Sequence, residues 1–287
     1  MTFSPQRRSL LRAALAAPLA GCAIAAPRDE AFARDMAKIE TASGGRLGVA
    51  AFDTGSQRQL AYRGGERFPM ASTFKVLAAA TILAREPALL ATRIRYAQAD
   101  LVQHAPVTAL HLADGMTNFE LCAAVLQVSD NPAANLLMRQ VGGPAGVSAY
   151  ARSLGDDTFR LDRWEPELNS AIPGDPRDTT TPLAMMRTLN KLVLGDALAP
   201  AARKLLVDWM LTSTTGAERI RAGVPPDWKV ADKTGSGGNG STNTIAVMWP
   251  PGRSPIVIAV YFTQSPKQRN DVVAAAAHAV AAAFALA

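Results

Sequence analysis

The stretch Ser72-Thr73-Phe74-Lys75 places a hydroxyl group and an amine three residues apart. On a helix these two side chains share one face, so the amine can lie beside a hydroxyl that it must activate. The apolar residues from Val76 to Leu83 predict that Ser72 begins a central, buried helix. Free N–H groups at such a helix start can stabilise an oxyanion. The pattern favours nucleophilic catalysis by Ser72, although a capping serine followed by a surface lysine would satisfy it as well.

Two further motifs carry polar groups that suit a reaction centre. Ser129-Asp130-Asn131-Pro132 predicts a helix start, with Asn131 as the N-cap and Pro132 at the first helical position. Lys233-Thr234-Gly235 lies at the end of a predicted strand. A cation and a hydroxyl on one strand can hold a substrate carboxylate, and the glycine lets another part of the backbone approach closely. Each motif alone is also typical of an ordinary turn or loop.

A fourth segment, Arg163-Trp164-Glu165-Pro166-Glu167-Leu168-Asn169, completes a set of motifs in a fixed order. With this set the sequence resembles the class A serine β-lactamases, from about Phe32 to the C-terminus. The resemblance implies that Ser72 is the nucleophile, that Lys75 is buried near Asn131 and Glu165, and that Ser129 passes a proton to the departing ring nitrogen. It also implies that the Asn131 amide holds the acyl-amide oxygen of the substrate, while Asp130 is structural.

In this family the residue at the position of Glu165 activates water for deacylation. The resemblance therefore gives that role to Glu165, with Asn169 helping to hold the water, while the base for acylation is either Lys75 or Glu165. The Glu165-Pro166 bond is a candidate cis peptide, because an X–Pro bond costs little in cis. Arg163 and Asp178 match an ion pair that closes the loop in the family.

The resemblance also implies a subsite for the substrate carboxylate and an oxyanion hole. The subsite is formed by Lys233, Thr234, Gly235 and Ser236. The backbone N–H of Ser236 would complete an oxyanion hole with that of Ser72. Arg219 matches a position where some members supply a further positive charge, against the alternative of an exposed arginine at a helix end. His104 stands where an aromatic residue usually lies at the cleft mouth, and an exposed loop histidine is the alternative.

The order of apolar segments predicts an α+β fold. Strand patterns occur near both ends of the chain and surround a helical middle. We expect an antiparallel sheet built from both chain ends and packed with helices, plus an all-helical domain, as in the β-lactamase and transpeptidase folds. The expected α/β domain comprises residues 29–62 and 212–287, and the all-helical domain comprises residues 63–211. The active site should lie in the cleft between them.

Residues 1–26 resemble an export signal, because a basic start is followed by a short apolar stretch. Gln6-Arg7-Arg8-Ser9-Leu10-Leu11 favours the twin-arginine export route, with an ordinary basic start as the alternative. Leu19-Ala20-Gly21-Cys22 resembles a lipobox, which would place a lipid anchor on Cys22. Ala23-Ile24-Ala25 offers a competing cleavage site that would release a soluble protein. Either route predicts a periplasmic protein.

Charge and cysteine content exclude several classes of function. The chain has 287 residues and a net charge of +6, which falls to +3 without the three arginines of the predicted signal. No basic run interleaves with aromatic residues, so we expect no nucleic-acid partner. The only cysteines are Cys22 and Cys122, and Cys122 lies in an apolar run that predicts a buried, inert thiol. We expect no metal, no cofactor and a monomer.

The sequence therefore predicts a serine enzyme that hydrolyses the β-lactam amide bond and confers β-lactam resistance. Two alternatives share several of its motifs. A cell-wall D,D-peptidase, one of the penicillin-binding proteins, has the serine, lysine and Lys-Thr-Gly elements but lacks a loop like that of Glu165. A penicillin-sensing domain would be acylated once and would not turn over.

Overall fold

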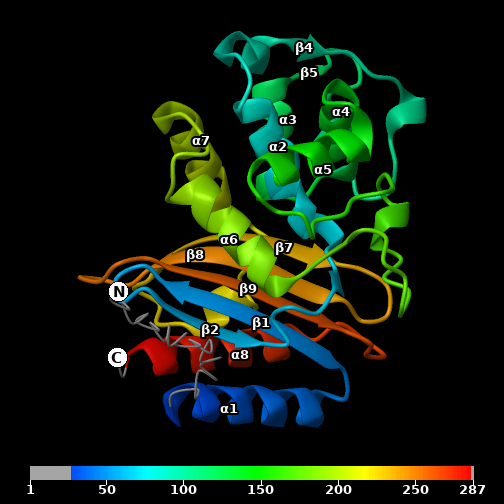
Figure 1. Cartoon of the computed structure of the whole chain (residues 1–287). Coiled ribbons are helices and arrows are strands. Elements are labelled where there is room, and N and C mark those ends of the chain that lie inside the picture. The colour runs from blue at the N-terminus through cyan, green and yellow to red at the C-terminus, as the bar shows by residue number, and fades with distance from the viewer. Residues whose placement is uncertain (1–26, 286–287) are drawn as a thin grey trace, which may run out of the picture.

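A five-stranded antiparallel sheet forms the centre of the protein (Figure 1), whose computed structural model describes residues 27–285. The strand order is β2-β1-β9-β8-β7. The strands comprise β1 (Arg46–Asp53), β2 (Arg58–Tyr62), β7 (Lys229–Ser236), β8 (Thr242–Trp249) and β9 (Ile256–Thr263). Pairing of β1 with β9 joins the two ends of the chain in one sheet, with Ala50 opposite Ala259. The predicted antiparallel sheet from both chain ends is confirmed.

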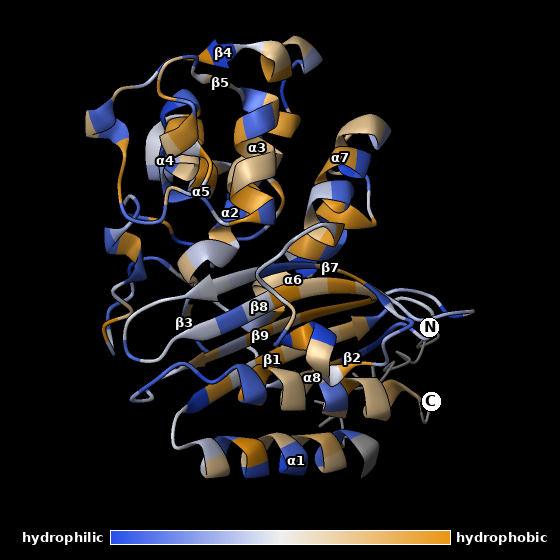
Figure 2. Cartoon of the chain, turned by 180° about the vertical axis from the view of Figure 1, so that it is seen from behind, coloured by the Kyte–Doolittle hydropathy of each residue, from blue (hydrophilic) through white to orange (hydrophobic). Residues whose placement is uncertain are grey.

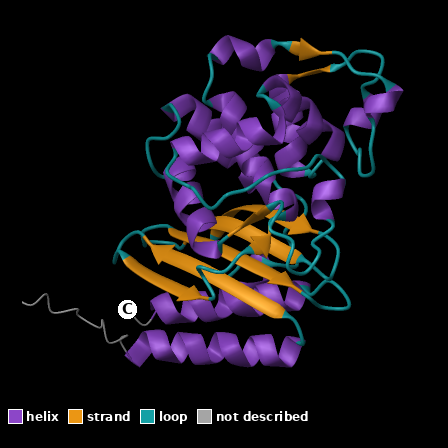
Figure 3. Ribbon diagram, turned by 45° about the vertical axis from the view of Figure 1, so that its right-hand side comes forward, coloured by secondary structure: helices purple, strands orange, loops and turns teal. Residues whose placement is uncertain are grey.

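In the described part of the chain, two α-helices cover one face of this sheet, and the other α-helices lie on the opposite face (Figure 3). The helices α1 (Pro27–Ser43) and α8 (Asn270–Ala285) pack against each other and against the first face. The helix α6 (Pro182–Val193) packs on the opposite face, against β1, β8 and β9. The predicted packing of helices on the sheet is therefore present.

Alternation along the central strand explains why both faces of the sheet are buried. In β9, Ile258 and Val260 belong to the core beneath α1 and α8, whereas Val257 and Ala259 belong to the core on the other side. Successive side chains of a strand point to opposite faces, so a strand between two helical layers is apolar throughout. Figure 2 shows this as hydrophobic colour along the central strands.

The middle of the chain is mostly helical, as predicted. Its α-helices are α2 (Lys75–Leu83), α3 (Asn118–Gln127), α4 (Asn131–Gln140), α5 (Gly143–Ser153), α6 and α7 (Pro200–Leu211). The sequence pattern did not indicate two small strand pairs, in which β3 (Phe68–Pro69) pairs with β6 (Thr179–Thr180), and β4 (Arg93–Ile94) with β5 (Met116–Thr117). Short 3-10 helices include η1 (Ala71–Phe74), η5 (Glu167–Asn169) and η6 (Ile220–Gly223). The helix α2 is central and fully buried.

The predicted export signal and Cys22 lie outside the described residues. Cys122 is buried in α3, and burial raises the pKa of its thiol. The predicted burial of Cys122 is confirmed, and a buried, protonated thiol is expected to be a poor nucleophile. None of the helices in residues 27–285 is both long and apolar enough to cross a membrane.

Candidate active site

Ser72 lies on η1, the 3-10 turn that leads directly into α2. The helix therefore begins as predicted, but its first turn is tighter than an α-helix. Ala71, the residue before the serine, has a φ angle of +44°, in the left-handed region that L-residues seldom adopt. The η1 turn packs against β7. These contacts place the serine hydroxyl where the helical layer meets the sheet.

Lys75 is completely buried and makes several polar contacts with neighbouring segments. Its Nζ atom lies 3.0 Å from Glu165 Oε1. It also donates hydrogen bonds to the backbone oxygen of Ser129 at 2.8 Å and to Asn131 Oδ1 at 2.5 Å. Burial lowers the pKa of Lys75, and the Glu165 carboxylate opposes this effect. The predicted neighbours of the amine are therefore present, and the alternative of a surface lysine is wrong.

Glu165 is the residue that joins the loop of residues 163–178 to the nucleophile. Ser72 Oγ donates to Glu165 Oε1 at 3.4 Å. The Glu165-Pro166 peptide bond is cis, as predicted. The other carboxylate oxygen accepts from the Asn169 side chain. One carboxylate thus contacts the hydroxyl, the amine and the amide that the sequence motifs singled out.

Ser129 and Asn131 lie in the turn before α4, but the helix begins differently from the prediction. Asp130, not Asn131, is the N-cap, and its carboxylate accepts from the backbone N–H of Ala133. The same carboxylate accepts from the N–H groups of Val107 and Thr108. Asp130 therefore bonds both to the first turn of α4 and to the segment of Val107 and Thr108. The Asn131 side chain is left free to contact Lys75. The prediction that Asp130 is structural agrees with these bonds.

Lys233 is the second buried amine of the site. Its Nζ atom donates to Ser129 Oγ at 3.0 Å, and Lys75 Nζ lies 3.3 Å from the same oxygen. Burial lowers the pKa of Lys233 well below its ordinary value, and the charge of Lys75 lowers it further. Thr234 follows on β7, and its hydroxyl lies 2.6 Å from that of Thr215. The Ser129 hydroxyl is therefore held between two amines.

Arg219 is buried, so the alternative of an exposed arginine is wrong. Its guanidinium donates to the backbone oxygens of Gly235 and Asn243 at 3.0 and 2.9 Å, to Ser236 Oγ at 2.6 Å and to Asn270 Oδ1 at 2.8 Å. Burial lowers the pKa of Arg219 to about 10, so the group stays positive at neutral pH. Its charge therefore lies next to Gly235 and Ser236, the last two residues of β7.

His104 is exposed, and its Nε2 atom lies 2.9 Å from the backbone oxygen of Val128. Its backbone oxygen accepts from the N–H of Asn131 at 3.0 Å, which ties this loop to the turn before α4. The histidine is therefore a loop residue beside the site, and stacking on a substrate stays a prediction. The predicted ion pair of the loop is confirmed, because Arg163 Nε lies 2.6 Å from Asp178 Oδ2.

Sequence reasoning missed two residues that hold the site together. Asn135 exchanges two hydrogen bonds with the backbone of Glu165, at 3.0 Å as acceptor and 2.9 Å as donor. It lies one helical turn after Asn131, so a second buried amide on the same helix face was a usable signal. Thr215, in the segment between α7 and η6, orients the hydroxyl of Thr234 on β7. No local pattern indicates that contact.

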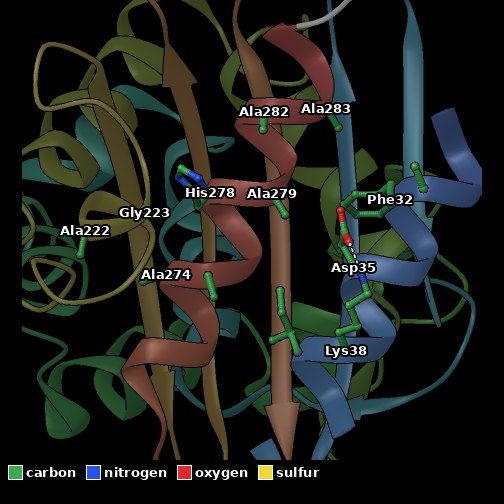
Figure 4. A pocket seen from close by; sticks show the side chains of 13 residues that line it. Phe32, Asp35, Lys38, Ala222, Gly223, Ala274, His278, Ala279, Ala282 and Ala283 are labelled. Atoms are coloured by element: carbon green, nitrogen blue, oxygen red, sulfur yellow. Dashed lines mark hydrogen bonds and ion pairs between the residues drawn. The ribbon is translucent and has the colours of Figure 1, made fainter. Parts of the chain in front are cut away.

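One groove of the protein is lined by none of the catalytic side chains. A groove of about 730 Å³ lies between α1 and α8, on the other face of the sheet (Figure 4). Alanine side chains and Phe32 line it, and the ion pair of Asp35 and Lys38 lies at its edge. In the described part of the chain, no group of three or more His, Cys, Asp or Glu side chains is arranged to hold a metal ion.

A nucleophilic serine beside two buried lysines and a carboxylate defines a serine acyl-transfer enzyme. The chain matches the model of the β-lactamase enzyme family over residues 31–284, so it belongs to that family. It is 52% identical to the carbapenem-hydrolysing β-lactamase KPC of Klebsiella oxytoca, over 96% of each chain. It is 54% identical to the β-lactamase CTX-M-25 of Escherichia coli, over 85% of this chain and 86% of the relative.

The solved structures agree with this assignment. The class A β-lactamase reconstructed as the last common ancestor of Gram-negative bacteria superimposes with a TM-score of 0.87. It shares 56% sequence identity, and the match covers 88% of this chain and 99% of that chain. The predicted family and fold are therefore confirmed, and the protein is a class A β-lactamase by sequence and by structure.

Proposed function

We propose that the protein hydrolyses the amide bond of β-lactam antibiotics through an acyl-enzyme on Ser72 and so confers resistance to them. One observation carries the mechanism: Glu165 Oε1 lies 3.4 Å from Ser72 Oγ and 3.0 Å from Lys75 Nζ. The carboxylate that can activate water is thus already in contact with the oxygen that becomes acylated. A penicillin-binding enzyme without such a loop would lack this group.

In the first half of the reaction, Ser72 attacks the carbonyl carbon of the lactam ring. The Ser72 proton moves to Glu165, the acceptor within hydrogen-bond reach, while the contact with Lys75 holds the carboxylate in position for this transfer. The negative charge that develops on the carbonyl oxygen faces the N–H groups of Ser72 and Ser236. The Asn131 amide holds the acyl-amide oxygen of the substrate.

Collapse of the tetrahedral intermediate breaks the C–N bond of the ring, and the nitrogen needs a proton. The Ser129 hydroxyl supplies it, because it lies within hydrogen-bond distance of both Lys75 and Lys233. Lys75 returns a proton to the serine oxygen and takes up the proton that Glu165 received from Ser72, so Glu165 is again a carboxylate before water attacks. The two cations also hold that hydroxyl in one position, which shortens the path of the proton.

The carboxylate found on most β-lactams would bind at the end of β7. Lys233 supplies the charge, and the hydroxyls of Thr234 and Ser236 supply hydrogen bonds. Arg219 strengthens this subsite from behind, since its guanidinium already donates to the Ser236 hydroxyl at 2.6 Å. His104 would contact the part of the substrate that extends from the cleft mouth.

In the second half of the reaction, water attacks the ester carbon on Ser72 and its proton moves to Glu165. Asn169 holds the Glu165 carboxylate and helps to orient the water. The ester bond breaks, and the Ser72 oxygen takes up the proton.

We also propose export to the periplasm through residues 1–26, with Cys22 as a lipid anchor where the lipobox is processed. The mature protein acts as a monomer, with the site between residues 63–211 and the remaining α/β part.

The function is tested by incubating the purified protein with a chromogenic cephalosporin in large excess. We expect many turnovers per protein molecule, and we expect none for Ser72→Gly. A penicillin-sensing domain would stop after one equivalent, and a D,D-peptidase would release far more D-alanine from a cell-wall peptide than hydrolysed lactam. Either result would overturn the proposed function.

A further inference from the structure

Asn243 is a fully buried side chain of β8 that contacts the segment immediately before the nucleophile. Its Nδ2 atom donates to the backbone oxygens of Pro69 at 2.8 Å and Met70 at 3.1 Å. Its Oδ1 atom accepts from the N–H of Phe262 on the neighbouring strand at 3.2 Å. The carboxamide therefore links the central sheet to the two residues that lead into η1.

This link acts at a point of close approach between the sheet and the nucleophile. Asn243 pairs with Gly235 across the β7–β8 ladder. A Cβ atom on Gly235 would lie 2.8 Å from the Met70 oxygen and 3.1 Å from the Ser72 nitrogen. The Met70 carbonyl and the Ser72 N–H therefore rest against β7, and a small shift of either would change the oxyanion hole.

The backbone at this point is in a conformation that its neighbours must maintain. Ala71, between the anchored Met70 and Ser72, has a φ angle of +44°. Such a conformation costs free energy and persists only where the surroundings fix it. The N–H of Met70 is held by the backbone oxygen of Asp178 at 2.9 Å, and its oxygen accepts from Asn243 on the sheet and from the Thr73 hydroxyl in η1. Asn243 is thus the residue through which the sheet holds the Met70 carbonyl.

We propose that Asn243 is a positioning residue for catalysis: its carboxamide fixes the Pro69 and Met70 carbonyls and thereby aims the Ser72 N–H at the developing oxyanion. The same residue connects to the carboxylate subsite, because Arg219 Nη1 donates to the backbone oxygens of both Asn243 and Gly235. Asn243 contacts no reacting atom. Its effect is transmitted through the backbone from residue 69 to residue 72.

The test compares Asn243→Ala with a matched control, Asn118→Ala. Asn118 is also fully buried, and its Nδ2 atom donates to the backbone oxygen of Leu89 at 2.9 Å, far from the site in α3. Both variants remove a buried amide that donates to a backbone carbonyl, so both should lose thermal stability. Only Asn243→Ala should slow acylation of Ser72, by about 10- to 100-fold, since loss of an oxyanion-hole donor costs at least that much. KM should change little.

A second measurement separates positioning from stability. A boronic acid forms a tetrahedral adduct on the serine and mimics the oxyanion, so its affinity should fall in Asn243→Ala by the same factor as the acylation rate. Asn243→Asp, which keeps the shape but has no N–H to donate, should behave alike. Asn243→Ser keeps a polar side chain and serves where the larger change prevents folding.

The inference is overturned if a folded Asn243 variant keeps the wild-type acylation rate and boronate affinity while losing only thermal stability. It is overturned equally if Asn118→Ala loses as much of both. The inference rests on the proposed role of Ser72. The two failures differ, because wild-type protein that forms no adduct with a β-lactam would contradict the proposed function, whatever the Asn243 variants do.

Discussion

Lys233 Nζ lies 3.0 Å from Ser129 Oγ, and the second amine of the site, Lys75, lies 3.3 Å from the same atom. Two cations that share one hydroxyl in a buried site repel each other. The pKa of Lys233 is accordingly lowered well below 10.5, first by burial and then by Lys75. A catalytic role that needs the charged form of Lys233 is therefore sensitive to alkaline pH.

Replacing Lys233 by arginine should extend the activity to higher pH. The substrate carboxylate binds the protonated amine, so raising the pH through the lowered pKa of Lys233 removes the charge and raises KM. Arginine stays protonated, with a pKa above about 12, so the alkaline fall of kcat/KM in Lys233→Arg should shift upward by at least about one pH unit. A pH profile of kcat/KM checks this. If kcat/KM fell at the same alkaline pH in wild type and in Lys233→Arg, the prediction would be wrong.

Arg219→Ala should weaken both substrate binding and the fold. The change leaves the oxygens of Gly235 and Asn243 without this donor and removes the charge behind the carboxylate subsite. Loss of one partner of a buried hydrogen bond costs about 1–3 kcal/mol, so thermal unfolding should occur several degrees lower. KM for a carboxylate-bearing lactam should rise about tenfold, as one charged contact is worth about 1.5 kcal/mol. Arg219→Lys is the control, and recovery of KM without recovery of stability would separate charge from hydrogen bonding.

Asp178→Asn should loosen the loop that carries Glu165. The Asp178 carboxylate pairs with Arg163 and also accepts from the N–H groups of Asp162 and Arg163. Asparagine keeps the shape and one acceptor but loses the charge, so we expect a destabilisation of about 1–3 kcal/mol, as for a hydrogen bond to a charged group. Because the loop positions the base for water, deacylation should slow more than acylation. Single-turnover and steady-state rates distinguish the two steps, and an equal loss in both would refute this assignment.

The sequence predicted the reacting groups better than the contacts that hold them. Ser72 and Lys75 could be assigned together because their spacing and the apolar helix after them are local features. The cap of α4 was predicted wrongly, since Asn131 and Asp130 are both good caps and only the fold shows that Asp130 also serves Val107. A local pattern cannot choose between two adjacent capping residues.

The supporting residues escaped prediction because their partners are distant backbone atoms. Asn243 bonds to Pro69, 174 positions away in the sequence, and Asn135 bonds to Glu165, 30 positions away. The sequence does not show whether a buried asparagine on a strand bonds to distant backbone atoms or only to atoms of adjacent residues. The burial of Arg219 likewise depends on how the loop before β7 folds over Asn270. Such contacts require the tertiary structure.

The contact between Glu165 and Ser72 is tested by intact-protein mass spectrometry of Glu165→Ala after mixing with a penicillin. Glu165 raises the pKa of Lys75, so its removal leaves a more readily deprotonated amine that can still assist attack by Ser72. Water, in contrast, loses its base. We expect stoichiometric protein carrying the mass of one intact penicillin on Ser72, persisting long after wild-type protein has returned to its free mass. Glu165→Ala that returns to its free mass as fast as wild type, with continued hydrolysis, would contradict the mechanism.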